Sequence, residues 1–328
     1  MTPDGAALAV LYENPAWFEL LFAALERRRV PYRKMPATDH VLDPAAGPLC
    51  GDIPGSGGAP ELVFNRMSAS AQTRGHGDTL FYAGDLLTAF ELRGVPVING
   101  TRAYAFEISK AKQLALLAAL GLPFPASRVV HRADQIAAAA RELRFPLVFK
   151  PNVGGRGAGI VRFDEPTALN DAAASGVLDF GSDSVALLQE YVPKRGGTIT
   201  RVEIVGGTFL YAIDVRASDE TFDLCPADIC SVPADGRSAA VAPRVTATAA
   251  HPPAEAIADV ERICREAGIE VGGVEFLVDD RDGRRLYYDI NALSNFVANA
   301  VQTIGFDPWE RLVDFLERRV RSGAVINN

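Results

Sequence analysis

The sequence has few residues of the kinds that most often form metal or nucleophilic sites. It contains 4 cysteines and 4 histidines among 328 residues. The cysteines are spaced unlike a zinc site, so free thiols in a reducing compartment are expected. No two histidines lie at ligand spacing, and each is interpreted as an ordinary surface or core residue. Neither a zinc centre nor a Ser/His or Cys/His nucleophile is indicated.

A basic excess, a long apolar run and a secretory leader are also missing. The formal net charge is -8, whereas general nucleic-acid binders need a basic surface to displace counterions. No apolar run is long enough to span a bilayer, and the N-terminal stretch lacks the basic and apolar regions of a signal peptide. We therefore expect a cytoplasmic protein without nucleic-acid or membrane partners, either a monomer or a homo-oligomer.

What is present is the composition and patterning of a globular α/β chain, long enough for two or three packed units. The segment ALAVLY reads as a strand, Asn14 and Pro15 as the cap and start of a helix, and ELVFNR as a further strand. A helix across residues 84–93 stops at Gly94 and leads into VPVIN. Further helices are expected at 107–120, 133–143, 254–267 and from Pro308.

Three oxygen-bearing side chains stand on two apolar runs late in the chain. In GGVEFLVDDRDGRRLYYDINALSNF, Asp289 and Asn291 share one face of a strand because successive side chains point to opposite faces. Glu275 lies on the preceding run, and Asp282 with Gly283 is typical of a hairpin turn. The three side chains either lie on a solvated hairpin face or bind a hard cation such as Mg²⁺.

The register of this hairpin decides whether the two acids can meet. Glu275 pairs with Asp289 only if the pairing is symmetric about Asp282, since a slip of one residue turns every side chain over. A two-residue turn would instead set Glu275 opposite Ile290. We therefore expect a loop of three or five residues centred on Asp282, with Gly283 at positive φ in a bulged turn.

The segment FKPNVGGRGAGIVRF places Lys150 at a strand end and four glycines in the loop that follows. Glycines let backbone N–H groups approach phosphate oxygens, and a lysine ammonium adds a point charge. The pattern is neither a Walker A loop nor a dinucleotide fingerprint. Taken alone, it indicates either a phosphate-binding loop or a flexible hairpin loop.

The order of these motifs resembles the ATP-grasp superfamily and, within it, the RimK-type glutamate ligases and their glutathione-synthetase-like relatives. The matching segments run from about Glu61 to the C-terminal helix and are AFELRGVPVINGTRAYAFEISKAKQLALLAALGLPFP, PLVFKPNVGGRGAGI, LLQEYV, GVEF and YYDIN. The resemblance implies an α/β and α+β ATP-grasp fold. An N-terminal open α/β domain at 1–100 would precede two α+β subdomains, 101–191 and 192–328, that clamp the nucleotide.

The same resemblance implies roles for individual residues. ATP would be held by two lysines, by the glycine loop and by a hinge strand: Lys110, Lys150, Gly154, Gly155, Gly157, Gly159, Gln189, Glu190, Tyr191 and Val192. Lys112 competes with Lys110 for the first role. Mg²⁺, or Mn²⁺ in its place, would be bound by Glu275, Asp289 and Asn291. Arg201 and Lys150 would be catalytic, and Arg66 and Asn295 would contact substrate.

Arg66 has two readings that the sequence leaves open. It occupies the place of an early family arginine in VFNRMSAS, where it would clamp a substrate carboxylate bidentately. The other reading is a surface ion pair.

Two segments depart from the family pattern. The acid that usually precedes the hinge-region arginine and binds ribose is missing from TITR, which ends at Arg201. The family's Arg-x-Asn segment is replaced within TFDLCPADICSVP, where Asp223 and Cys225 stand at the two positions. One triphosphate contact is therefore in doubt, with Arg216 and Arg244 as candidate replacements, and the acceptor pocket is expected to be peculiar to this chain.

The implied activity is that of an ADP-forming carboxylate–amine ligase. A substrate carboxylate would attack the γ-phosphate of ATP, and an amine on an amino acid or small peptide would then displace phosphate from the acyl phosphate. Such a reaction requires no protein nucleophile. The alternatives are a nucleotide-binding regulatory protein that kept the fold and a ligase that modifies a protein tail. The intact metal set favours an enzyme.

Overall fold

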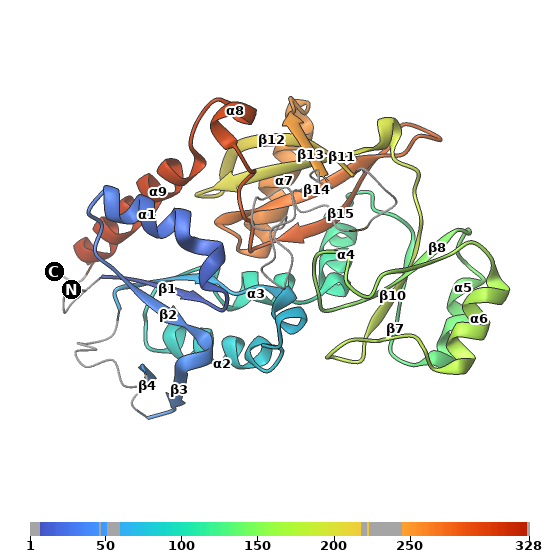
Figure 1. The fold of residues 1–328 in the computed structure, drawn as a ribbon, viewed down its shortest axis with the longest axis horizontal. Helices are drawn as coiled ribbons and strands as arrows, with labels where there is room; N and C mark the ends of the chain where they lie inside the picture. Colours follow the sequence, from blue (N-terminus) through green and yellow to red (C-terminus); the bar gives the residue numbers. More distant parts are fainter. Residues whose placement is uncertain (1–6, 46, 51–59, 218–221, 223–244, 327–328) are drawn as a thin grey trace, which may run out of the picture.

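The computed structural model describes residues 7–45, 47–50, 60–217, 222 and 245–326. Within these residues the strands form two four-stranded sheets, one five-stranded sheet and one two-stranded ribbon. Figure 1 shows β1 and β2 on the left, β7, β8 and β10 on the right, and β11 to β15 above and between them. No helix in the described part of the chain is long and apolar enough to cross a bilayer.

The first sheet is parallel, with the strand order β2-β1-β5-β6. Its strands are β1 Leu8–Tyr12, β2 Tyr32–Pro36, β5 Leu62–Arg66 and β6 Val97–Ile98. The helices and the ribbon around it are η1 Pro15–Phe18, α1 Glu19–Arg27, η2 Ala37–Asp39, β3 His40–Asp43, β4 Gly47–Cys50, η3 Ala69–Arg74, α2 Thr79–Leu92 and α3 Thr101–Glu107. β1 and β5 are buried along their whole length, as strands covered on both faces should be. Asn14 caps η1 as predicted, whereas α2 begins five residues before the predicted start.

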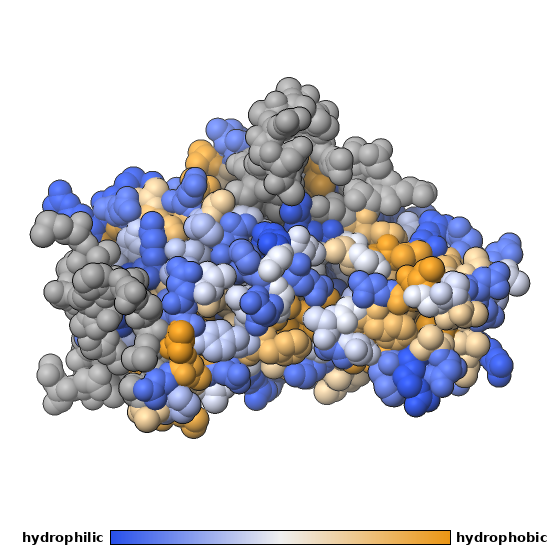
Figure 2. Space-filling model, turned by 60° about the horizontal axis from the view of Figure 1, so that its bottom comes forward, coloured by the Kyte–Doolittle hydropathy of each residue, from blue (hydrophilic) through white to orange (hydrophobic). Residues whose placement is uncertain are grey.

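The second sheet is antiparallel, with the order β7-β10-β8-β9. Its elements are β7 Ser127–Val130, η4 Ala133–Gln135, α5 Ile136–Ala140, β8 Leu147–Pro151, β9 Val161–Phe163, α6 Pro166–Ser175 and β10 Ala186–Glu190. The α-helical part of the predicted helix 133–143 is thus short. Apolar residues of α5 and α6 pack with those of β8 and β10 in one core. The face in Figure 2 is largely hydrophilic, and its hydrophobic residues gather mainly on the right, the side on which Figure 1 shows this sheet.

The third sheet is antiparallel, with the order β13-β12-β11-β14-β15. Its elements are α4 Lys110–Ala119, η5 Arg195–Gly197, β11 Thr198–Val205, β12 Thr208–Ala217, β13 Val245–Ala249, α7 Ala254–Ala267, β14 Val271–Val278, β15 Arg285–Asn291, α8 Ala300–Ile304 and α9 Pro308–Ile326. The bounds of α7 and the start of α9 agree with the prediction. The boundaries expected near residues 100 and 191 fall between the three large sheets, and the division into domains remains a prediction.

Asn99 joins the first sheet to the third. Its side-chain amide donates to the carbonyls of Val271 at 2.6 Å and Ala292 at 2.8 Å. Its side-chain oxygen accepts from the N–H groups of Glu270 and Val271. Asn65, on β5, donates to the carbonyl of Asn99 at 2.8 Å. Because Asn65 and Asn99 are buried, their polar groups need partners; the side chain of Asn99 finds them beside the third sheet, and its backbone carbonyl finds one on the first.

The predicted helix 107–120 begins three residues later than expected, and a separate helix precedes it. α3 ends at Glu107, and α4 begins at Lys110. Ser109 caps α4, because its hydroxyl accepts from the N–H of Lys112 at 3.3 Å. The break places Lys110 in the first turn of a new helix rather than in the middle of a longer one.

The hairpin of β14 and β15 pairs Glu275 with Asp289, as predicted. The predicted length of its loop is wrong. The N–H of Asp279 donates to the carbonyl of Arg284 at 2.9 Å, so four residues lie between these two positions instead of three or five. Gly283 has a φ of 79°, in agreement with the prediction for the turn.

A β-bulge reconciles this even loop with the pairing of the acids. Phe276 pairs with Tyr287, but the register shifts before Glu275, so Tyr288 is an extra residue on β15. The hydroxyl of Tyr288 donates to Glu275 at 2.7 Å. Tyr288 therefore lies on the face of the acids and not on the opposite face, where simple alternation would put it.

Gly272 permits the close approach of β14 and β15 beside the acids. A Cβ at this position would overlap the carbonyl oxygen of Asn291 and press on the side chain of Ile269. We expect Gly272→Ala to lower the free energy of unfolding by about 1–3 kcal/mol through overpacking, measured by denaturant titration. Gly84→Ala is the control: position 84 lies in α2 with open space around it, so that change should raise stability by about 0.5–1 kcal/mol. Equal stability of Gly272→Ala and the natural chain would contradict this packing.

Candidate functional site

A pocket lies where the loop after β5, the loop after β8, the end of β10 and the β14–β15 hairpin come together. All of the predicted site residues except Gly159 and Arg66 line this pocket. Those that do are Lys110, Lys150, Gly154, Gly155, Gly157, Gln189, Glu190, Tyr191, Val192, Arg201, Glu275, Asp289, Asn291 and Asn295. The fold thus brings them together from distant parts of the chain, while their individual roles stay predictions.

The two lysines predicted to hold the nucleotide both line the pocket. The Lys110 ammonium donates to the carbonyl of Gly154 at 2.7 Å, and Lys150 is buried near the end of β8. Burial and the charge of Lys110 lower the pKa of Lys150 to about 8, against the opposite effect of nearby acids on the hairpin. Lys112 is exposed and does not line the pocket. Of the two candidates for the first lysine, Lys110 is therefore the one at the site.

The loop after β8 depends on glycine for two different reasons. Gly154 and Gly157 have φ values of 145° and 70° and line the pocket, where the lack of side chains leaves backbone groups accessible. Gly159 has a φ of 72°, and a Cβ there would lie 2.8 Å from the side chain of Pro151. Gly159 therefore shapes the loop from outside the pocket.

The side chains of the predicted hinge strand are held by their neighbours. Gln189 donates from Nε2 to the hydroxyl of Ser127 at 2.9 Å, and Glu190 accepts from the N–H of Arg144 at 2.9 Å. The guanidinium carbon of Arg162 lies 4.4 Å from the ring centre of Tyr191. With its side chains so engaged, this segment is suited to contact a ligand through its backbone.

Arg201 is surrounded by acceptors in the buried part of the site. It donates from Nε to Glu203 at 2.6 Å, from one terminal nitrogen to Glu275 at 3.0 Å and from the other to the hydroxyl of Ser294 at 2.7 Å. Burial alone would lower the pKa of Arg201, but the two carboxylates outweigh burial and raise it. The guanidinium is therefore charged, and its orientation is fixed.

Glu275 and Asp289 form a repulsive pair of acids. Both oxygens of Glu275 accept hydrogen bonds, one from Arg201 and the other from Tyr288. Burial raises the pKa of Glu275; Arg201 opposes this shift and Asp289 adds to it. Among the described residues no ion pair or hydrogen bond is made by the Asp289 side chain. A cation beside the two acids would relieve their repulsion.

The residues around these acids fit Mg²⁺. The ligands predicted for it are carboxylate and amide groups, and Mg²⁺ is commonly held by one or two carboxylates together with substrate phosphates. The side-chain nitrogen of Asn291 and the side-chain oxygen of Asn295 are buried without a hydrogen-bond partner. The described residues contain no group of three or more His, Cys, Asp or Glu side chains suited to a metal, so the site offers two acids at most.

Arg66 lies behind the pocket rather than in it. Its side chain is 1% exposed, donates to the carbonyl of Ser294 at 2.6 Å and packs against the rings of Phe18 and Phe64. Burial lowers the pKa of Arg66 to about 10, while Glu107 and neighbouring acids oppose this, so the group stays charged at neutral pH. The structure shows a buried support for the Ser294 segment. It does not show the surface ion pair that was one reading, and a contact with substrate stays a prediction.

Several buried polar residues of the site were not found from the sequence. Glu203 stands two residues after Arg201 on β11, so strand alternation could have put it on the same face. Glu107 accepts from the N–H groups of Ala69 and Leu293, and no local pattern marks that role. Burial raises the pKa of Glu107.

The first departure from the family pattern is visible in the pocket. Ile199 lines it close to where a ribose-binding acid was expected. Lys194 also lines it, and its ammonium has no ion-pair partner among the residues that the structure describes. Arg216 is described but is not part of the lining. Asp223, Cys225 and Arg244 lie outside the described residues.

Comparisons with known proteins agree with this geometry. Residues 108–224 match the family model described as the RimK-like ATP-grasp domain. A probable alpha-L-glutamate ligase from Thioalkalivibrio sulfidiphilus is 32% identical over 144 residues, which cover 43% of this chain and 46% of that relative. The ribosomal protein bS6--L-glutamate ligase of Salmonella paratyphi B is 27% identical over 243 residues, 73% of each chain.

A solved structure resembles the whole fold. It is the ATP-grasp ligase PsnB complexed with a phosphomimetic variant of its minimal precursor, Mg and ADP. It superposes with a TM-score of 0.68 at 18% identity and covers 97% of this chain and 100% of that one.

The fold is therefore that of the ATP-grasp class, as predicted. Within this class, residues 108–224 are similar to the RimK-like ATP-grasp domain. The two relatives described above are named as ligases of L-glutamate.

The position of Lys150 leads to a test of nucleotide binding. We expect Lys150→Ala to weaken the binding of ATP by about 1.5–3 kcal/mol, the contribution of a hydrogen bond to a charged group. Isothermal titration calorimetry with ATP and Mg²⁺ measures the change. Lys112→Ala, which removes an exposed lysine of α4, should leave the affinity unchanged. An unchanged affinity in Lys150→Ala would remove Lys150 from the phosphate site.

Proposed function

We propose that the chain is an ADP-forming carboxylate–amine ligase that works through an acyl phosphate. The observation that carries this proposal is the distribution of charge around one pocket. Lys110 and Lys150 come from α4 and β8, and Glu275 and Asp289 come from the β14–β15 hairpin. Cations suit a polyphosphate, and paired acids suit the cation that accompanies it. The lining contains no histidine or cysteine among its described residues, and an acyl phosphate needs no protein nucleophile.

The reaction would have two steps. A carboxylate oxygen of the first substrate attacks the γ-phosphorus of ATP, the bond to the bridging oxygen breaks and ADP leaves. The amine of the second substrate then attacks the acyl carbon, phosphate leaves and the amine loses a proton. Lys110, Lys150 and the glycine loop would hold the phosphates, and the segment from Gln189 to Val192 would hold the base.

Arg201 would stabilise the negative oxygens that develop in these steps. Of its five N–H hydrogens, the observed contacts use three, directed to Glu203, Glu275 and Ser294. The charge and the remaining donors are available to the phosphoryl group. Since these three contacts fix the guanidinium, Arg201 needs little rearrangement to act.

Glu275, Asp289 and Asn291 would hold Mg²⁺, with Mn²⁺ as the alternative for the same oxygen ligands. When bound, the cation would neutralise negative charge on the phosphates. This assignment is supported by the Asp289 carboxylate, which has no hydrogen-bond or ion-pair partner within the described part of the chain, and by the PsnB structure, which contains Mg and ADP.

The proposed substrates are a carboxylate and an amine carried by an amino acid or a small peptide. L-glutamate is the first candidate, because two of the relatives bear the names of L-glutamate ligases. A peptide is the second candidate, because PsnB was also solved with a precursor peptide.

The proposal predicts the products directly. Purified protein with ATP, Mg²⁺, L-glutamate and a matrix of amino acids and dipeptides should release ADP and phosphate in equal amounts. Ion-exchange chromatography separates the nucleotides, and mass spectrometry identifies the amide product. AMP and pyrophosphate would overturn the proposal, because they indicate an acyl adenylate. A peptide ending in glutamate, added to the same matrix, tests the protein-tail alternative.

Asp289 provides a second test. Asp289→Asn removes a charge from the proposed metal site but keeps the volume of the side chain, so activity should fall by at least about 100-fold while the fold is retained. Rates are measured over a Mg²⁺ titration, and thermal unfolding checks the fold. Asp280→Asn alters an exposed acid in the same hairpin and should retain activity. Full activity in Asp289→Asn would exclude Asp289 from the metal site.

A further inference from the structure

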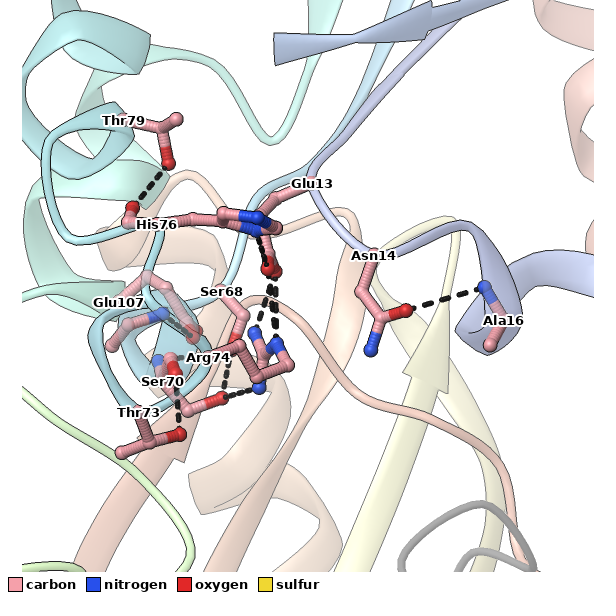
Figure 3. Close-up of polar contacts among 11 residues, drawn as sticks. Glu13, Asn14, Ala16, Ser68, Ser70, Thr73, Arg74, His76, Thr79 and Glu107 are labelled. Atoms are coloured by element: carbon pink, nitrogen blue, oxygen red, sulfur yellow. Dashed lines mark hydrogen bonds and ion pairs between the residues drawn. The ribbon is translucent and has the colours of Figure 1, made fainter. Parts of the chain in front are cut away.

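The loop after β5 forms one wall of the pocket, and its polar contacts are drawn in Figure 3. Ser68 and Ser70 line the pocket on this wall. Their side-chain oxygens lie 2.8 Å apart. On the opposite side, Gly155 comes so close that a Cβ there would lie 3.3 Å from the Cβ of Ser70. The two hydroxyls therefore stand next to the glycine loop.

A buried ion pair lies behind this wall. Glu13 accepts from Nε of Arg74 at 3.0 Å and from a terminal nitrogen at 2.6 Å, and it lies 2.6 Å from Nδ1 of His76. The Glu13 side chain is 2% exposed. The guanidinium carbon of Arg74 also lies 4.1 Å from the ring centre of Trp17. Because two bonds to one carboxylate fix the plane of an arginine, the remaining terminal nitrogen points to Ser70, 3.0 Å away.

The directions of these hydrogen bonds leave one hydroxyl hydrogen of the Ser68–Ser70 pair without an acceptor among the described residues. Arg74 can only donate, so Ser70 accepts from it. The N–H of Ser70 likewise donates to the hydroxyl of Ser68. One hydroxyl hydrogen is used between the two serines, whichever of them donates. The second hydrogen has no acceptor among the described residues, and both serines face the pocket.

The backbone N–H groups of residues 69–71 cannot take the place of that donor. The N–H of Ala69 donates to Glu107, and the N–H of Ala71 donates to the carbonyl of Ser68. With the N–H of Ser70 also in use, the free hydrogen of the serine pair is a side-chain donor that this turn offers to the pocket.

We propose that the Ser68–Ser70 pair donates a hydrogen bond to a carboxylate oxygen of the substrate, with Arg74 as the positioning residue. The shared chemistry is an anionic oxygen, which a nucleotide phosphate could also provide. The carboxylate is favoured because the proposed phosphate site already has two lysines and the glycine loop. This wall offers one hydrogen-bond donor, and the charge of the neighbouring Arg74 is balanced by Glu13. The assignment rests on the proposed function and adds the element that recognises its substrate.

The shared hydrogen gives the test a distinctive pattern. Ser68→Ala and Ser70→Ala each keep one hydroxyl with a free hydrogen, so each should raise the KM for the carboxylate substrate by only about threefold. The double variant keeps none and should raise that KM by about 10- to 100-fold, with the KM for ATP within about twofold. Arg74→Met should resemble Ser70→Ala, and Arg74→Lys should restore part of the loss.

The kinetics use ATP, Mg²⁺ and L-glutamate first, then every other carboxylate with which the natural chain releases phosphate. Thr73→Val is the matched control, because Thr73 lies in the same loop but bonds only the carbonyl of Ser70 and does not line the pocket. Unchanged KM values in the double variant, with normal thermal unfolding, would overturn the inference. A raised KM for ATP alone would assign the donor to the nucleotide and also overturn it. No turnover by the natural chain with any carboxylate would instead overturn the proposed function.

Discussion

The site depends on one arginine placed between two buried acids on neighbouring strands. Arg201 forms ion pairs with Glu203 on its own strand and with Glu275 on β14, and without it neither buried carboxylate would have an ion-pair partner among the described residues. Breaking a buried ion pair by removing one partner costs about 3–5 kcal/mol. The hydroxyl of Ser294, which donates to Glu203 while accepting from Arg201, completes the set. The strands that carry the catalytic and metal-binding candidates are therefore tied together before any ligand arrives.

This network extends to the first sheet through two contacts. Arg66, at the end of β5, donates to the carbonyl of Ser294. Asn99, just after β6, joins the first and third sheets through four hydrogen bonds of its side chain. The N-terminal sheet is thus held in a fixed position relative to the acids, and its loop can present Ser68 and Ser70 to the same pocket.

Much of this arrangement could be predicted from local sequence, and the reasons are physical. Strand alternation led to the predicted pairing of Glu275 with Asp289. Gly154 and Gly157 could be assigned to the pocket because glycines leave the backbone of a loop accessible. The bulge at Tyr288 could not be predicted, because nothing in an alternating run shows where one extra residue is accommodated. The loop length was inferred from symmetry alone and was wrong for that reason.

Other features required the three-dimensional structure. Arg66 is a charged residue in a short polar segment, which suggests a role at the surface or in substrate binding. In the structure it is buried against Phe18 and Phe64 and lies behind the pocket. Glu13 and Arg74 lie 61 positions apart, and no local pattern connects them. Contacts of this kind arise from tertiary packing, which a single sequence does not encode in any short window.

The bulge on β15 also separates two parts of the hairpin that would otherwise be coupled. Without it, the register of Val278 with Arg285 would continue along the strands and set Glu275 opposite Tyr288, with Asp289 on the other face. With the register set anew beside Glu275, the four-residue loop and the pairing of the two carboxylates are both kept. The conformation of the outer loop and the geometry of the acids are therefore specified by different residues of the same strand.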